Sequence, residues 1–69
     1  MNDSIYKVIE LVGTSKISWE DAAKKAVEFA AIKKKNLRIA EVKKLDLKVE
    51  DGLVIAYRAR VSLSFKYDF

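Results

Sequence analysis

Apolar positions along the chain follow strand-like and helix-like periods, in the order of one strand, one helix and two further strands. Residues 5–12 (IYKVIELV) are rich in β-branched side chains and are mainly apolar at both odd and even positions. A strand that is covered on both faces has this pattern. We expect this strand to end at Gly13, with one face against the helix and the other against a second subunit.

A helix is predicted to begin after Ser18. The Ser18 hydroxyl can accept a hydrogen bond from the backbone N–H of Asp21, and the Asp21 carboxylate can reach back to cap the helix. Three lysines, residues 33–35, suit the carbonyl end of the helix, and Asn36 suits the C′ position that follows it. One stripe of the helix is apolar and mostly alanine, which allows close approach to a sheet: Trp19, Ala22, Ala23, Ala26, Val27 and Ala30.

Two strands joined by a tight turn are predicted after the helix. The apolar set changes parity near Lys43 within residues 37–50, which indicates either one bent strand with a bulge or two strands. Asp51-Gly52 is typical of a type I′ turn. Residues 53–67 then alternate cleanly, with apolar side chains at odd positions. The predicted fold is α+β, in the order β-α-β-β: one domain, residues 1–69, whose three-stranded antiparallel sheet wraps around one helix.

Composition excludes several classes of function. The chain has 69 residues, a formal net charge of +4, no Cys and no His. The absence of Cys excludes thiol chemistry, and the absence of His removes the commonest general base. A Ser–Lys pair stays formally possible, but nothing in the sequence favours it, so we expect no enzymatic activity. No apolar run approaches the ~20 residues that span a bilayer, and no secretory leader is visible, so we expect a cytoplasmic protein without membrane contact. Because a chain of about 60 residues buries only about 60% of its unfolded surface, oligomerisation is expected.

Two binding functions follow from charged residues. Acidic side chains lie on or near the second strand, and copies brought together by symmetry can form a calcium site from them; Asp46 and Glu50 are the candidate ligands. A surface-charge role for these carboxylates remains the alternative. A basic nucleic-acid adaptor is a further alternative, but the face of the last strand that carries Arg58, Arg60 and Lys66 has no interleaved aromatics, which disfavours it.

Four segments of the chain, in order and through nearly its whole length, resemble the dodecin family. They are YKVIELVGTS, SWEDAAKKAVEFA, NLRIAEV and EDGLVIAYRARVSLSFKY. The resemblance implies a hollow homododecamer that stores or sequesters flavins rather than catalysing a reaction. It also implies that flavin pairs of the riboflavin or FMN type lie between tryptophans of two subunits, with a glutamine on the last strand bonded to the ring. Some bacterial relatives also bind coenzyme A.

The chain departs from that family pattern at both flavin-contacting positions. Ile39 occupies the place of the stacking tryptophan, and Arg58 follows Tyr57 where the family has glutamine. Isoleucine offers no π face, and arginine offers hydrogen-bond donors only. We therefore expect flavin binding to be weak or absent, and we expect the helix start SWEDA and the ending SLSFKY to place the chain nearer the calcium-binding dodecins. Trp19, the only tryptophan, is expected to be a core or interface anchor.

Overall fold

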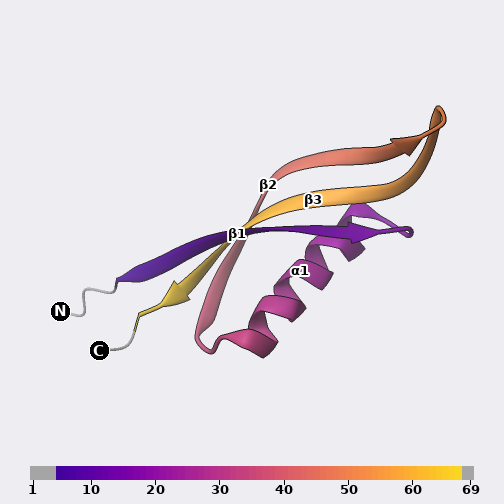
Figure 1. Cartoon of the computed structure of the whole chain (residues 1–69). Coiled ribbons are helices and arrows are strands. Elements are labelled where there is room, and N and C mark those ends of the chain that lie inside the picture. Colours follow the sequence, from indigo (N-terminus) through magenta and orange to yellow (C-terminus); the bar gives the residue numbers. More distant parts are fainter. Residues whose placement is uncertain (1–4, 68–69) are drawn as a thin grey trace.

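The computed structural model describes residues 5–67 and contains one helix against one three-stranded sheet (Figure 1). The elements are β1 (Tyr6–Ser15), α1 (Trp19–Lys33), β2 (Leu37–Glu50) and β3 (Leu53–Lys66). The sheet order is β1-β3-β2, and both pairs are antiparallel. The predicted β-α-β-β fold is confirmed. With 15 residues, the helix of the described part is too short to cross a bilayer.

The core lies between α1 and the central strand β3. Alanines of the helix face alternate residues of the strand, and the buried set is Ala22, Ala26, Ala30, Ala59, Val61, Leu63 and Phe65. The small alanine side chains let the helix lie close to the sheet. Ile9 and Leu11 of β1 pack against this core, while Tyr6, Val8 and Val12 on the opposite face of β1 are exposed. The expected contact of one face of β1 with the helix is thus confirmed, and a second subunit on the other face stays a prediction.

The predicted end of the first strand at Gly13 is wrong. β1 continues to Ser15, because Gly13, Thr14 and Ser15 still pair with Ala59, Arg58 and Tyr57 of β3. Gly13 serves the packing instead: a Cβ at this position would overlap the carbonyl oxygen of Ala22 and lie 3.2 Å from the Cβ of Ala26. Glycine here lets the helix backbone rest on the strand.

The N-cap of the helix is Ser18, as predicted, but the partner of the Asp21 carboxylate and the C-terminal end of the helix differ from the prediction. The Ser18 hydroxyl accepts from the Asp21 N–H at 3.0 Å. The Asp21 carboxylate does not reach back to Ser18; it accepts from the Ser15 hydroxyl, a nearer donor at 2.6 Å. Asn36 has the left-handed conformation, with φ 68°. The C-cap is Lys34, so Asn36 is the second residue after the cap and not the first, C′, as predicted.

The β2–β3 hairpin confirms the predicted bend and turn. β2 is one continuous strand with a register shift between Val42 and Lys44, which places the bulge at Lys43. Asp51 and Gly52 have φ values of 52° and 77°, as a type I′ turn requires. The hairpin extends past the start of α1 as an arm, here called the hairpin arm (residues 45–58), so the molecule is elongated, 54 × 20 × 14 Å (Figure 1).

Candidate functional site

Trp19 joins the start of the helix to the base of the hairpin arm. Its indole Nε1–H donates to the backbone carbonyl of Asp46 on β2 at 3.1 Å. Its ring meets that of Tyr57 on β3 edge-on, with centroids 5.2 Å apart and planes at 74°. Edge-to-face pairs of this kind are stabilising. Trp19 is 36% exposed and does not belong to the buried core. Within one chain it fixes α1 against the two strands of the arm, and its contact with a second subunit stays a prediction.

Asp46 and Arg58 form an ion pair beside this anchor. They lie directly opposite each other in the β2–β3 register. The guanidinium donates through Nε to Oδ1 at 2.6 Å and through a terminal nitrogen to Oδ2 at 2.8 Å. This hydrogen bonding lowers the pKa of Asp46 and raises the pKa of Arg58. Both carboxylate oxygens are therefore engaged, and the basic face of β3 is partly neutralised at Arg58.

Ile39 and Arg58, the two residues expected at the flavin-contacting positions, are apart in a single chain. Ile39 pairs with Ser64 near one end of the β2–β3 ladder, whereas Arg58 pairs with Asp46 nearer the other. Seven residues of β2 separate the two rungs, roughly 20 Å of strand. The Ile39 side chain is exposed and offers an aliphatic surface. A pocket that uses both positions therefore requires a second copy of the chain.

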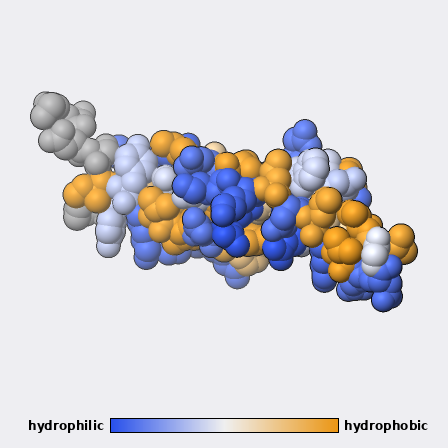
Figure 2. Space-filling model, turned by 90° about the horizontal axis from the view of Figure 1, so that it is seen from above, coloured by the Kyte–Doolittle hydropathy of each residue, from blue (hydrophilic) through white to orange (hydrophobic). Residues whose placement is uncertain are grey.

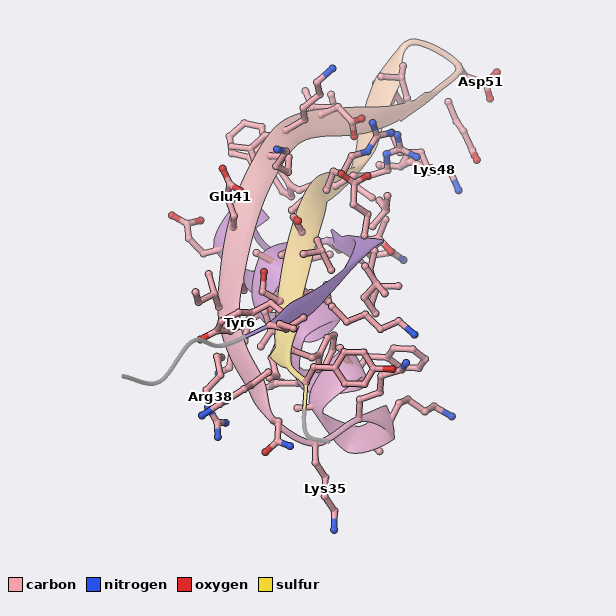
Figure 3. The ribbon with its side chains drawn as sticks, turned by 90° about the vertical axis from the view of Figure 1, so that its left-hand side faces the viewer. Tyr6, Lys35, Arg38, Glu41, Lys48 and Asp51 are labelled. Atoms are coloured by element: carbon pink, nitrogen blue, oxygen red, sulfur yellow. The ribbon has the colours of Figure 1, made fainter. Side chains whose placement is uncertain are left out.

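Asp46 and Glu50, the candidate cation ligands, do not form a calcium site within one chain. Glu50 pairs with Leu53 at the hairpin turn, four residues from Asp46 along the strand. Within residues 5–67, no three acidic residues are grouped so that they could hold a metal ion. Two other acidic residues of the hairpin, Glu41 and Asp51, lie at separate places in Figure 3, midway along β2 and at the hairpin turn. The acidic residues that the structure describes in one chain do not provide the six to eight oxygens that Ca²⁺ takes.

Ser15 is the residue at this end of the molecule that pattern reading missed. Its buried hydroxyl donates to Asp21 and accepts from the backbone N–H of Ile17 at 2.9 Å, and Ser18 N–H lies 3.4 Å from it. Asp21 also pairs with Lys25 at 3.2 Å. The hydrogen bond from Ser15, with that from Lys25, lowers the pKa of Asp21. The signal in the sequence was a serine three residues before the helix cap, a spacing from which a hydroxyl can bind the loop amides.

Comparison with known proteins gives a consistent family. The family model that describes dodecins matches residues 5–68. Calcium dodecin from Mycobacterium tuberculosis is 43% identical over 63 residues, which cover 91% of this chain and 89% of that protein. The structure of dodecin from Streptomyces coelicolor has a TM-score of 0.91 at 30% identity, with coverage of 100% and 99%.

A crystal structure of the calcium-chelating M. tuberculosis dodecin, which has a calcium-binding site, also matches, with a TM-score of 0.84 at 42% identity and coverage of 94% of this chain and 93% of that one. The β-α-β-β order, the antiparallel sheet and the packing of one helix against it agree with these structures. The chain belongs to the dodecin family.

Proposed function

We propose that the chain is a non-enzymatic small-ligand-binding or storage protein that assembles into a hollow homododecamer, with weak or absent flavin binding at the usual family position. Its location is the cytoplasm, and its principal partner is a further copy of itself. Family membership supports the binding function, the assembly and the absence of catalysis, and the exposed apolar surface of the single chain supports the assembly.

Apolar side chains on the outside of β2 support self-association. In one chain the strand is exposed along nearly its whole length. Its large apolar residues, each more than 40% exposed, are Ile39, Val42, Leu45, Leu47 and Val49. Figure 2 shows apolar patches on one face of the molecule, including the end opposite the grey residues. Large exposed apolar patches mark interaction surfaces, so contact between copies is the favoured state of this strand.

The ion pair between Asp46 and Arg58 is the main observation in support of a ligand pocket that differs from the family's flavin pocket. A glutamine at position 58 would present both a donor and an acceptor to a flavin ring, whereas the Arg58 guanidinium presents donors only and already binds Asp46 at 2.6 and 2.8 Å. Ile39 adds apolar contact without stacking. These residues do not fit the family's stacked flavin pair.

Native mass spectrometry of protein purified without added ligand tests both parts of the proposal. Twelve chains of 7.9 kDa give a discrete species of about 95 kDa, because closed symmetry fixes the number of copies. A monomer or dimer as the dominant species would overturn the assembly. Retained flavin in the 95 kDa species would overturn weak flavin binding, and any other excess mass would identify the stored ligand.

Calcium binding is the second candidate function, because calcium dodecin from M. tuberculosis is 43% identical to this chain. Copies of Glu50 and Asp46 brought together between subunits are the proposed ligands, and Arg58 must then share or release Asp46. Millimolar calcium is expected to raise the melting temperature of the assembly, since a ligand that binds only the folded state stabilises it.

The calcium test compares the chain with Glu50→Gln and with the matched exposed control Glu28→Gln. Calcium is expected to raise Tm in the parent chain and the control, with a smaller rise in Glu50→Gln and no comparable rise with magnesium. An unchanged Tm in calcium would contradict the candidate function. An equal rise in Tm in all three proteins would show that Glu50 is not a calcium ligand.

A further inference from the structure

Three lysines from three different elements surround a hollow beside the base of the hairpin arm. Lys16 comes from the loop after β1, Lys25 from α1 and Lys48 from β2; Figure 3 shows Lys48 on the arm. The hollow has a volume of about 660 Å³, within the range of small-molecule sites. Its lining is Thr14, Ser15, Lys16, Ile17, Lys25, Lys48, Ile55 and Ala56.

The charge of this hollow is positive and largely uncompensated. Asp21 pairs with Lys25, but the same carboxylate also accepts the hydrogen bond from Ser15. Among the residues that the structure describes, neither Lys16 nor Lys48 has an ion-pair partner. Two free ammonium groups and a third that shares its carboxylate favour an anion between them.

An apolar groove continues from the cationic hollow along the seam between β1 and α1. The second hollow, of about 330 Å³, shares Thr14 and Lys25 with the first. It is also lined by the apolar residues Leu11, Val12, Ala26 and Phe29. The floor of the first hollow is also apolar, with half-buried Ile55 and Ala56. The two hollows together present cations at one end and an apolar surface at the other.

We propose that this groove binds an organic phosphate with an apolar body. The phosphate lies among Lys16, Lys25 and Lys48, where the Thr14 hydroxyl can also donate to it, and the apolar body lies along the seam toward Phe29. The site is separate from Ile39 and Arg58. It rests on the proposed function only in assigning a ligand class to a small-ligand-binding protein.

Calorimetric titration of the purified full-length protein with adenosine monophosphate, adenosine and inorganic phosphate tests the site. Adenosine monophosphate is expected to bind at least about tenfold more tightly than either of its halves, because only it occupies both ends of the groove. No binding of adenosine monophosphate at millimolar concentration would overturn the proposal. Adenosine that binds as tightly as the monophosphate would overturn the role of the lysines.

Matched lysine variants separate a built site from general attraction to a basic protein. Lys16→Gln with Lys48→Gln is expected to weaken adenosine monophosphate binding about tenfold or more, as loss of charge-assisted hydrogen bonds implies. The control, Lys24→Gln with Lys35→Gln, removes the same charge from exposed residues that line neither hollow and is expected to bind like the parent. Equal losses in the two variants would overturn the proposal.

Phe29→Ser tests the apolar end of the groove. Phe29 is exposed in one chain, so the substitution does not disturb the core. The substitution is expected to weaken the binding of adenosine monophosphate and to leave the binding of inorganic phosphate unchanged. An unaltered affinity for adenosine monophosphate would overturn the assigned position of the apolar body. Native mass measured on the same samples shows whether the assembly persists, so failure of this site is distinguishable from failure of the proposed dodecamer.

Discussion

Asp46 and Arg58 face each other across β2 and β3, and their charged groups meet through hydrogen bonds of 2.6 and 2.8 Å. The backbone carbonyl of the same Asp46 accepts the indole N–H of Trp19. One residue of β2 therefore connects the helix start with both strands of the hairpin arm. A change at Asp46 is expected to affect the stability of the chain as well as the conformation of Arg58.

Restoring the family side chains at both altered positions is expected to create flavin binding. Ile39→Trp with Arg58→Gln supplies a stacking ring and a side chain with both donor and acceptor; stacking on an aromatic is worth ~1–3 kcal/mol per ring in nucleic-acid complexes. Quenching of riboflavin fluorescence measures the gain. Ile39→Leu with Arg58→Lys is the control and is expected to leave riboflavin fluorescence unchanged. A double variant that assembles normally yet does not quench would show that the pocket lies elsewhere.

Acid is expected to destabilise the protein through Asp21 and Asp46. Hydrogen bonds from Ser15 and Arg58, respectively, lower their folded-state pKa values below the ordinary 3.8. A lowered folded pKa contributes stability above the unfolded pKa, and that stability is lost as the pH falls from about 4 through the folded values. Melting temperatures measured from pH 6 to pH 2 follow this loss.

Asp46→Asn provides the comparison for the acid effect. This variant is expected to have a lower Tm than the parent at pH 6 and a smaller further decrease toward pH 2, since one of the two titrating carboxylates is gone. Glu28→Asn, on the exposed face of α1, is the control. Coincident Tm curves for the parent and Asp46→Asn would show that the ion pair with Arg58 adds nothing to stability.

Gly13→Ala is expected to destabilise the fold strongly. The added Cβ would overlap the carbonyl oxygen of Ala22, which belongs to the helix backbone and cannot rotate away. Overpacking of a core costs about 1–3 kcal/mol, and backbone displacement places this change at the upper end. Urea unfolding measures the difference. Gly52→Asn is the control, since a Cβ there meets nothing within 4 Å and asparagine tolerates a positive φ. Similar unfolding midpoints for the two variants would contradict the close packing at Gly13.

Trp19→Phe separates the hydrogen bond of the indole from its ring contact. Phenylalanine keeps an aromatic edge near Tyr57 but loses the N–H that donates to Asp46, which is expected to lower the free energy of unfolding by about 1 kcal/mol. Trp19→Ala removes both contacts and is expected to lower it further. Chemical denaturation followed by circular dichroism measures both variants. Equal values for the parent and Trp19→Phe would show that the indole hydrogen bond is replaced by water without loss.

Local sequence determined the elements of this protein and much of their detail. The Ser18 cap, the alanine stripe, the parity change at Lys43 and the Asp51-Gly52 turn each depend on neighbouring residues, so short-range patterns were sufficient to predict them. The family resemblance also predicts that Ile39 and Arg58 occupy the flavin-contacting positions, and this assignment stays a prediction. The end of the first strand was predicted wrongly at Gly13. A glycine in a local pattern indicates the end of a strand, whereas here its missing side chain makes room for the helix backbone.

Only the tertiary structure decided which side chains meet. Asp46 and Arg58 are twelve residues apart and Trp19 and Asp46 twenty-seven, and only the β2–β3 register and the position of α1 bring them into contact. The register also separated Ile39 from Arg58, and the extended backbone of β2 keeps Asp46 and Glu50 apart, four residues from each other along the strand. Lys16, Lys25 and Lys48 line one hollow for the same reason: residues from different elements are brought together by packing geometry, which no periodicity along the chain records.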